Sequence, residues 1–439
     1  MQLTIKYPLH AKHPTVHACE IMDHFGIGLE QGEHVVADDV DVPIQEGDIV
    51  SFTGPSGSGK SSLLRAAATQ LDNVVDMHAI ELPEKILVDG VGLPLAQTLE
   101  LLSACGLSEA QLMLRTPHEL SDGQRYRYRL ALAIARGAKW ILADEFTASL
   151  DRVLAKTIAY NVGRIAAKWR CGFLIATTHD DILADLQPTL HVRCRLDAEP
   201  AVIRREREPN RISFAENLTI CAGKKSDWPI FARWHYRGKG LGYVRKVFLL
   251  HFGNENVGIC LFATPCASLR ARNRYFGIHS RRQNLHLRAL NAQVATLARV
   301  VLHPTYRGIG VAAAFVRRCC ELMPYPWIET LTEMGHINPF FEKAGFTRVG
   351  VCEHADRTLA EHSAIYGGKR KTHGRQQLLA QTTHEKSRHA APVYYIFDNR
   401  GATHRQRTGD SAEAILDKKT RLPLFAEETP IEEAQNEET

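Results

Sequence analysis

The feature of this sequence that most constrains its fold is a glycine-rich loop at residues 54–61, which reads Gly-Pro-Ser-Gly-Ser-Gly-Lys-Ser. A β-rich run at 48–53 precedes the loop and a helical run at 60–70 follows it. A strand, a loop of the form G-x-x-x-x-G-K-[ST] and a helix in this order are typical of phosphate-binding loops, because glycines let backbone N–H groups wrap around phosphates. An ordinary Gly/Ser turn is the alternative, and the flanking strand and helix disfavour it. We therefore expect the loop to bind nucleotide phosphates through Gly54, Ser56, Gly57, Gly59, Lys60, Ser61 and Ser62.

Length and composition limit the class of protein. A chain of 439 residues is long enough for two or three domains. Its 44% hydrophobic and 23% charged residues are typical of globular proteins. No apolar run approaches the roughly 18 residues needed to cross a bilayer, and the start lacks the pattern of a secretory signal. The ten cysteines have no repeated spacing, which argues against a disulfide framework or a zinc site. We expect a cytoplasmic protein without a membrane-spanning segment.

Further motifs follow the glycine loop in the first half of the chain. Residues 120–124, Leu-Ser-Asp-Gly-Gln, open a helical run, and an apolar run at 140–143 ends in two carboxylates, Asp144 and Glu145. Asp144 is placed to organise Mg²⁺ together with Ser61, and Glu145 to polarise the attacking water as general base. His179 follows the next strand-like run, at 172–177, and is placed to contact the γ-phosphate. The alternation of β-rich and helical runs predicts a parallel sheet with crossover helices.

These elements in this order resemble the ABC-type ATPase family. The resemblance covers the first domain and implies binding and hydrolysis of ATP with Mg²⁺. It also implies an ATP-dependent head-to-tail homodimer, in which residues 120–124 of one copy close over the ATP of the other. In that arrangement Ser121, Gly123 and Gln124 contact the nucleotide, with Asp122 at a position where the family usually has glycine.

Two features depart from transporter members of the family. The stretch from Ser61 to Leu120 is short, so the helical part that grips membrane partners is reduced and a transporter role is weakened. Gln97 is the one candidate for the family's glutamine loop. Phe25 is a candidate for the aromatic residue that stacks on adenine, although such a phenylalanine is more often part of a core.

A second glycine loop lies in the other half of the chain. A strand-like run at 298–304 leads into Thr-Tyr-Arg-Gly-Ile-Gly-Val-Ala at 305–312 and then into a helical run. This loop, with Asn-Pro-Phe-Phe-Glu-Lys-Ala-Gly-Phe at 338–346, resembles the GNAT acyltransferase family. The resemblance implies acetyl-CoA as cofactor, with the CoA diphosphate held by Arg307, Gly308, Gly310 and Ala312 at a helix N-terminus. An unrelated α/β module with a glycine turn is the alternative.

The catalytic groups of this second domain are less defined. Many GNAT members have a tyrosine where this chain has Phe341, so the usual acid for the departing thiolate is missing. Glu329, His336 and His235 are candidate bases, and each residue of this kind is more often structural than catalytic. An ABC ATPase followed by a GNAT domain resembles a family of ATPases fused to predicted acetyltransferases. This resemblance predicts the domain architecture but does not identify the acceptor of the acyl group.

The fold class that we expect is α/β, an ABC-type P-loop ATPase domain followed by a GNAT-like α/β acyltransferase domain. The expected domain ranges are 1–203 for the ATPase, 204–211 for a linker, 212–400 for the acyltransferase domain with a basic insertion near 358–391, and 401–439 for a polar and acidic tail. Residues 422–425 are apolar enough to dock on a domain.

Basic clusters interleaved with aromatic residues predict the acceptor. They include Trp234, Tyr236, Tyr243, Tyr275 and Phe276 among many arginines, and phosphates bind arginine while splayed bases stack on rings. RNA or DNA is therefore favoured over protein as the substrate of an ATP-regulated acyltransferase. Two alternatives stay open, an ATP-driven clamp whose GNAT domain only binds, and the ATPase subunit of a transporter.

Overall fold

The computed structural model describes residues 1–9, 13–29, 32–196, 198–208, 211–235, 241–278, 283–352, 391–401 and 421–425. The chain divides into two compact units. The first unit comprises residues 1–213 and 304–309, and the second comprises 214–303 and the residues from 310 onward. The expected insertion at 358–391 lies outside the described residues, except for Ala391.

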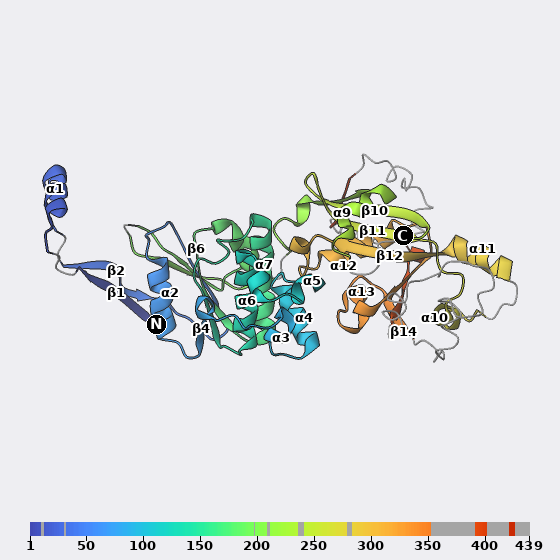
Figure 1. Cartoon of the computed structure of the whole chain (residues 1–439), viewed down its shortest axis with the longest axis horizontal. Coiled ribbons are helices and arrows are strands. Elements are labelled where there is room, and N and C mark those ends of the chain that lie inside the picture. Colours follow the sequence, from blue (N-terminus) through green and yellow to red (C-terminus); the bar gives the residue numbers. More distant parts are fainter. Residues whose placement is uncertain are drawn as a thin grey trace, which may run out of the picture. The chain divides into compact units, whose positions relative to one another are not determined.

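A six-stranded sheet forms the centre of the first unit, in the order β4-β5-β6-β3-β7-β8 (Figure 1). Its strands are β3 (Ile49–Thr53), β4 (Val74–Asp76), β5 (Trp140–Ala143), β6 (Gly172–Thr177), β7 (Leu190–Arg193) and β8 (Ala201–Arg204). The first five run parallel, and β8 is antiparallel to β7. Every residue of β3, β5 and β6 is buried, as expected for parallel strands covered on both faces.

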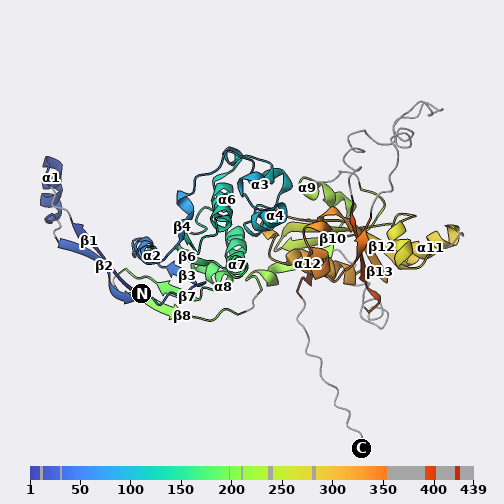
Figure 2. The ribbon, with the colours of Figure 1, turned by 90° about the horizontal axis from the view of Figure 1, so that it is seen from below.

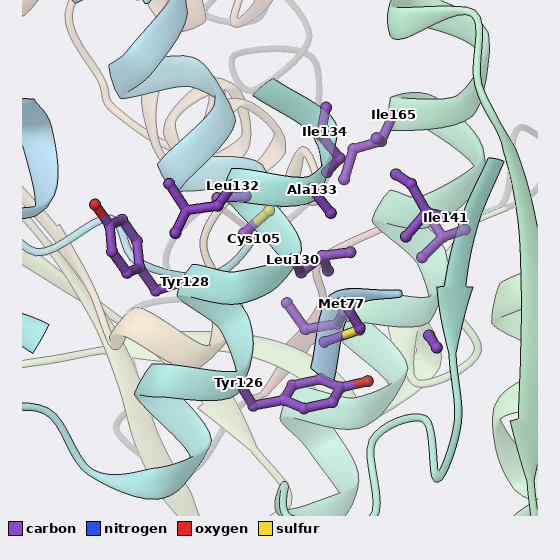
Figure 3. Close-up of a cluster of buried hydrophobic side chains, with 14 of the residues drawn as sticks. Met77, Cys105, Tyr126, Tyr128, Leu130, Leu132, Ala133, Ile134, Ile141 and Ile165 are labelled. Atoms are coloured by element: carbon purple, nitrogen blue, oxygen red, sulfur yellow. The ribbon is translucent and has the colours of Figure 1, made fainter. Parts of the chain in front are cut away.

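The helices of the first unit connect these strands. They are α1 (Val16–Phe25), α2 (Lys60–Thr69), α3 (Leu87–Gly90), α4 (Leu95–Ala104), α5 (Ala110–Met113), α6 (Asp122–Ala135), α7 (Arg152–Trp169) and α8 (Leu183–Leu186), with short 3₁₀ turns η1 (Met77–Ala79), η2 (Pro117–Glu119), η3 (Asp180–Ile182) and η6 (Pro304–Tyr306). Figure 3 shows side chains of α6, among them Tyr126 and Leu130, packed with Met77 and Ile141 in one apolar cluster. This core fixes α6 against the central sheet.

A two-stranded antiparallel ribbon of β1 (Gln2–Leu9) and β2 (Gly32–Asp41) also belongs to the first unit. The ribbon carries α1 at its far end (Figures 1 and 2), and no residue of α1 is buried. Leu3 and Ile5 are buried and join the core around β3 and α2. One end of the ribbon is therefore anchored beside the helix that follows the glycine loop.

An eight-stranded sheet forms the second unit, in the order β14-β15-β13-β12-β11-β10-β9-β16. The strands are β9 (Leu218–Ala222), β10 (Val244–Phe252), β11 (Glu255–Ala263), β12 (Val294–Leu302), β13 (Trp327–Thr332), β14 (Thr347–Val351), β15 (Val393–Asp398) and β16 (Leu422–Pro423). Only β12 and β13 pair in parallel. The expected hairpin at Gly253 joins β10 to β11, with Gly253 at φ 57°, a conformation that glycine adopts without strain.

The helices of the second unit are α9 (Trp228–Ala232), α10 (Arg270–Tyr275), α11 (Gln283–Gln293), α12 (Val311–Glu321) and α13 (Phe340–Lys343), with 3₁₀ turns η4 (Ala215–Asn217), η5 (Lys225–Asp227) and η7 (Glu333–His336). Helix α12 buries Val311, Phe315 and Val316. The apolar segment at 422–425 docks as an edge strand, because β16 pairs with β9 and Leu424 is buried. This part of the expected tail therefore belongs to the second unit.

The structure also bears on the cysteines and on membrane insertion. Seven of the ten cysteines are buried, and all ten are free thiols. Among the described helices, none combines the length and apolar character required for a membrane span.

Candidate functional site

The glycine loop at 54–61 has the backbone of a phosphate cradle. Gly54, Gly57 and Gly59 have φ values of 141°, 82° and 80°, which are strained for residues with a Cβ. A Cβ on Gly54 would lie 2.3 Å from the Cys194 carbonyl oxygen, and one on Gly59 would lie 2.2 Å from Val36 Cγ1. Glycine is required at both positions for backbone conformation and for space.

Lys60 turns back over this cradle. Its Nζ donates a hydrogen bond of 2.6 Å to the Pro55 carbonyl oxygen, and the residue is only 9% exposed. A buried ammonium held by a loop carbonyl provides the positive charge that bound phosphates require. Ser58 Oγ donates to the same carbonyl, which helps to close the loop.

The sheet order brings the other ATPase motifs to the loop. Neighbouring strands β5, β6 and β3 end at Asp144, at His179 and at the glycine loop, respectively, and ligands of parallel sheets bind at the carboxyl ends of the strands. Ser61 Oγ donates a 2.9 Å hydrogen bond to Asp144 Oδ1. A hydroxyl and a carboxylate at this separation are oxygen ligands of the kind that Mg²⁺ binds together with phosphate oxygens and water.

Glu145 and His179 flank this pair. Glu145 is exposed at φ 49°, a left-handed conformation that is uncommon for a residue other than glycine, and its N–H donates to Asp144 Oδ1. His179 begins η3 and is half-buried. A cavity of about 470 Å³ lies beside the loop and is lined by Gly54, Pro55, Thr178, Asp180, Arg193, Cys194, Arg195 and Leu196.

The Leu-Ser-Asp-Gly-Gln motif begins helix α6 as a capping box. Gln124 N–H donates to Ser121 Oγ, and Ser121 N–H donates to Gln124 Oε1. Ser121 is exposed, and Gly123 packs close to Leu150. Within one copy, Ser121 and Gln124 therefore fix the start of a helix whose positive end faces outward.

Two residues near the loop were not singled out from the sequence. Tyr7 on β1 donates a 2.9 Å hydrogen bond to Ser62 Oγ, and its ring is 48% exposed. His78 Nε2 lies 2.9 Å from the Asp144 carbonyl oxygen, to which it can only donate. The sequence signal for Tyr7 is an aromatic residue in β1, two strands before the loop strand β3. The signal for His78 is a polar residue shortly after β4, the strand that pairs with β5.

The candidates Phe25 and Gln97 lie elsewhere. Phe25 ends α1 and is 74% exposed, so it is not a core residue. Gln97 is exposed on α4, within the helical segment between β4 and β5, and the side chain that contacts the Asp144 carbonyl oxygen is His78. Their roles in adenine stacking and in the glutamine loop stay predictions.

The second glycine loop divides between the two units. Arg307 Nη1 donates to the Ser108 carbonyl oxygen at 3.2 Å, and Arg164 donates to the Gly308 carbonyl oxygen, with all four residues in the first unit. Gly310, at φ 86°, caps α12, and Ala312 lies in its first turn. Gly308 also has φ 86°, a left-handed conformation that favours glycine.

Strands β12 and β13 pair over three residues only, at the start of each strand. Val294, Ala295 and Thr296 pair with Trp327, Ile328 and Glu329. Beyond this point β12 continues along β11 and β13 continues along β15. Thr330 Oγ1 donates to the Leu297 carbonyl oxygen where the pairing stops.

A buried polar cluster surrounds Glu329 at the same point. Its Oε1 accepts from Arg272 Nη1 at 3.0 Å and from Thr296 Oγ1 at 2.9 Å, and its Oε2 accepts from Tyr394 at 2.9 Å. Burial, reinforced by the Glu329 charge, raises the pKa of Tyr394, which keeps its hydroxyl protonated. With three donors bound, Glu329 anchors this part of the sheet.

The remaining candidate catalytic residues are positioned as follows. His336 Nε2 lies 2.7 Å from the Ala391 carbonyl oxygen, and the His235 ring packs edge-on against Trp228. Phe341 is buried on α13, with its ring centroid 5.5 Å from that of Tyr395. Tyr236, in the expected basic and aromatic cluster, lies outside the described residues.

Comparison with known proteins places the first unit in a family. No protein-family profile matches the chain. The chain is 33% identical over 171 residues to the aliphatic sulfonates import ATP-binding protein SsuB 3 of Paraburkholderia xenovorans, which covers 35% of this chain and 69% of the relative. It is 29% identical over 197 residues to the lipoprotein-releasing system ATP-binding protein LolD of Bordetella avium, covering 36% of this chain and 85% of the relative.

A search of solved structures returns a dimeric ATP-binding cassette in a post-hydrolysis state with ADP and Pi, at 19% identity and a TM-score of 0.33. That match covers 40% of this chain and 94% of the cassette. Because its TM-score is low, the family assignment depends on the sequence relatives. Those relatives, with the motifs gathered at Ser61, Asp144 and Glu145, make the first unit an ATP-binding and ATP-hydrolysing unit that uses Mg²⁺. The chain belongs to the family of ABC-type ATP-binding proteins.

Proposed function

We propose that the protein couples an ATP-driven switch in the first unit to an acyl-CoA-dependent N-acyltransferase in the second. In the switch, two copies bind head to tail, so that Ser121, Gly123 and Gln124 of one copy cover the nucleotide on Lys60 of the other. The exposed Ser121 at the start of a 14-residue helix supports this reading, because a helix N-terminus favours an anion. ATP then joins the copies and hydrolysis releases them.

We expect Tyr7 to stack on the adenine of bound ATP. Its half-exposed ring stands beside Ser62, directly after the residues that hold the phosphates. Tyr7→Ala should weaken ATP binding by roughly 5- to 150-fold, the equivalent of about 1–3 kcal/mol for one base stacked on a ring. Isothermal titration calorimetry measures this. Tyr7→Phe keeps the ring and should bind ATP within about 3-fold of the parent, and Phe25→Ala should have no effect; equal affinity of Tyr7→Ala and Phe25→Ala would refute the assignment.

For the second unit, the observation that carries the proposal is the short parallel pairing of β12 with β13 beside a glycine-capped helix. The strands part after Thr296 and Glu329, and α12 begins at Gly310, a few residues after β12 ends. In this proposal the CoA diphosphate lies at the start of α12. The amide-containing arm of CoA then runs along β12 and β13 toward Glu329. Helix α12 has 11 residues, enough for a dipole that favours a diphosphate.

Tyr395 is the hydroxyl that we propose in place of the missing acid at Phe341. Its ring packs on Phe341, and its hydroxyl donates to Glu342 Oε1 at 2.8 Å. Burial and the hydrogen bond to Glu342 raise the pKa of Tyr395 to about 12, so the hydroxyl stays protonated at neutral pH. A protonated phenol at this place can give a proton to a departing thiolate.

Acetyl-CoA titration of the full chain tests the cofactor. The Lys60→Ala background removes nucleotide binding at the first loop, which would otherwise compete for the adenine and phosphates of CoA. In that background, Ala312→Glu should weaken acetyl-CoA binding by roughly 10- to 150-fold, since a charge-assisted contact contributes about 1.5–3 kcal/mol. Ala314→Glu, two residues further along α12, is the matched control and should bind like the parent.

Arg307→Glu should weaken acetyl-CoA binding in the same experiment. If the parent did not bind acetyl-CoA, the acyltransferase interpretation would be refuted. The same conclusion would follow if neither Ala312→Glu nor Arg307→Glu changed the affinity for acetyl-CoA. The clamp with a GNAT-like binding unit would then be favoured.

A nucleic acid is the acceptor that we favour, because exposed arginines and aromatic rings occur together on the second unit. Arg233 lies over Trp234 with 4.1 Å from the guanidinium carbon to the ring centroid, and Arg400 lies over Trp327 at 4.7 Å. Such pairs of cation and ring suit a phosphate backbone with unstacked bases. Location in the cytoplasm remains a prediction.

The second candidate function is the ATPase subunit of a transporter. The names of the relatives favour it, since both are ATP-binding proteins of import or release systems. This candidate predicts that the full chain co-purifies with an integral membrane protein after detergent extraction.

A further inference from the structure

The second unit contains a cavity of about 250 Å³ that the ATPase does not use. It lies among α10, α11 and the first residues of β12 and β13, and its lining includes Arg272, Phe276, Leu290, Gln293, Val294 and Trp327. The ring centroids of Phe276 and Trp327 are 5.1 Å apart in an edge-to-face arrangement. Pockets for drug-sized ligands measure roughly 300–1,000 Å³, so this cavity accepts a single small ring system.

A buried guanidinium forms the polar part of the lining. Arg272 is 0% exposed, with Nη1 bonded to Glu329 and Nη2 bonded to the Cys266 carbonyl oxygen. Its Nε–H, also buried, has no hydrogen-bond partner among the described residues. A buried donor of this kind is costly to leave unsatisfied.

The cavity lies at the point where acyl transfer would occur. Val294 and Trp327, both in its lining, are the first residue pair of the parallel β12–β13 register. Two residues further on, Thr296 and Glu329 are the last pair before the strands part. Arg272 belongs to both places, because it lines the cavity and holds Glu329.

We propose that this cavity binds the acceptor, an amino-bearing nucleobase of a single-stranded nucleic acid; the proposal rests on the acyltransferase function proposed above. The rings of Phe276 and Trp327 favour a flat ligand over the flexible side chain of a lysine. A neutral base with an exocyclic amine supplies such a planar face, and its amine is the nitrogen that an N-acyltransferase acylates.

Exposed arginines next to the cavity suit the attached phosphates. Arg270 and Arg274 lie on α10, and Arg288 lies on α11, all three exposed. Arginines outside and rings inside are what a protein needs to hold a strand by its backbone while one base enters a pocket.

The transfer step balances without a further reactant. The exocyclic nitrogen attacks the thioester carbonyl carbon of the acyl-CoA, a C–N bond forms and the C–S bond breaks. The departing thiolate takes up one proton, which gives free CoA, and the nitrogen loses one, which gives the N-acylated base.

A matched pair of alanine substitutions on α11 tests the cavity in the full-length protein. Ala289 lines the cavity, whereas Ala292, on the same helix, does not, and both are exposed, so Ala289→Phe and Ala292→Phe should fold alike. The probes are fluorescein-labelled 12-residue homopolymers of adenylate, cytidylate, guanylate and uridylate, each as RNA and, with thymidylate in place of uridylate, as DNA. Fluorescence anisotropy gives their affinities. Uracil and thymine lack an exocyclic amine, so they report the binding of phosphates and of a stacked ring without the amine.

We expect one amino-bearing homopolymer to bind at least about 10-fold more tightly than oligouridylate, the effect of roughly 1.4 kcal/mol from hydrogen bonds to its amine. Ala289→Phe should reduce that affinity to the oligouridylate level, whereas Ala292→Phe should retain it. Equal affinities for all homopolymers, or equal losses in both variants, would overturn the proposal. Binding of a lysine-rich peptide that Ala289→Phe alone abolishes would overturn it in favour of a protein acceptor.

Transfer of label from [¹⁴C]acetyl-CoA to the tightly bound homopolymer is the second readout. Transfer by the parent and by Ala292→Phe, with loss in Ala289→Phe, supports both proposals. Base-selective binding without any binding of acetyl-CoA would refute the acyltransferase and leave the base pocket standing. The RNA and DNA arms decide which nucleic acid is the natural source of the base.

Discussion

Replacing Glu145 by glutamine should lower ATP turnover by about 10²- to 10⁴-fold, the usual contribution of a general base. Glutamine has nearly the same shape but cannot accept a proton from the attacking water, while Ser61, Asp144 and the glycine loop stay intact. ATP binding should therefore persist. Phosphate release measures the turnover, and light scattering after gel filtration should show the Glu145→Gln protein as a dimer with ATP and a monomer without it.

Two variants serve as controls for this result. Glu100→Gln makes the same chemical change at an exposed ion pair with Lys168 and should hydrolyse ATP at the parental rate. Lys60→Ala should neither bind ATP nor dimerise, because it removes the buried ammonium of the cradle. Parental turnover by Glu145→Gln would show that another group activates the water.

Replacing Arg272 by methionine should lower the free energy of unfolding of the second unit by about 3–5 kcal/mol. Both members of the Arg272–Glu329 pair are almost fully buried, with side-chain exposures of 0% and 3%, and removing one partner leaves the other charge buried without its counterion. For a unit of this size, roughly 2–4 °C of melting temperature is lost per kcal/mol, which differential scanning calorimetry resolves.

The double variant Arg272→Met with Glu329→Gln separates the charge effect from packing. It should recover more than half of the lost stability, because a neutral amide can still accept from Thr296 and Tyr394. Arg318→Met breaks a more exposed pair with Glu321 and should cost no more than about 1 kcal/mol. If Arg272→Met and Arg318→Met were equally stable, the buried pair would not be an anchor of the second unit.

Some parts of the site were predictable because they are local. The glycine loop, the capping box at Ser121 and the carboxylates at the end of β5 each require particular residues within a few positions. Backbone conformations with positive φ at Gly54, Gly57 and Gly59 need glycine wherever the chain folds. Strand-loop-helix order follows from the same short windows.

Other parts depend on residues that meet only through the sheets. Tyr7 reaches Ser62 across 55 positions, His78 reaches Asp144 across 66, and Arg272 reaches Glu329 across 57. Phe25 and Gln97 were chosen by their place along the chain, which does not show which side chains meet at the loop. The cavity behind Trp327 likewise needs two helices and two strands from separate segments.

The sequence by itself determined that this chain binds ATP through an ABC-type unit, because the phosphate-binding loop is formed by consecutive residues. The backbone conformation of this loop requires glycines at fixed positions, and the sequence has them there. The tertiary structure alone decided which aromatic residue bonds to Ser62, which side chain contacts Asp144, and where a buried arginine meets a small cavity in the second unit. The physical reason is that strand order and register, which are set by burial of the whole core, bring distant residues within hydrogen-bond range.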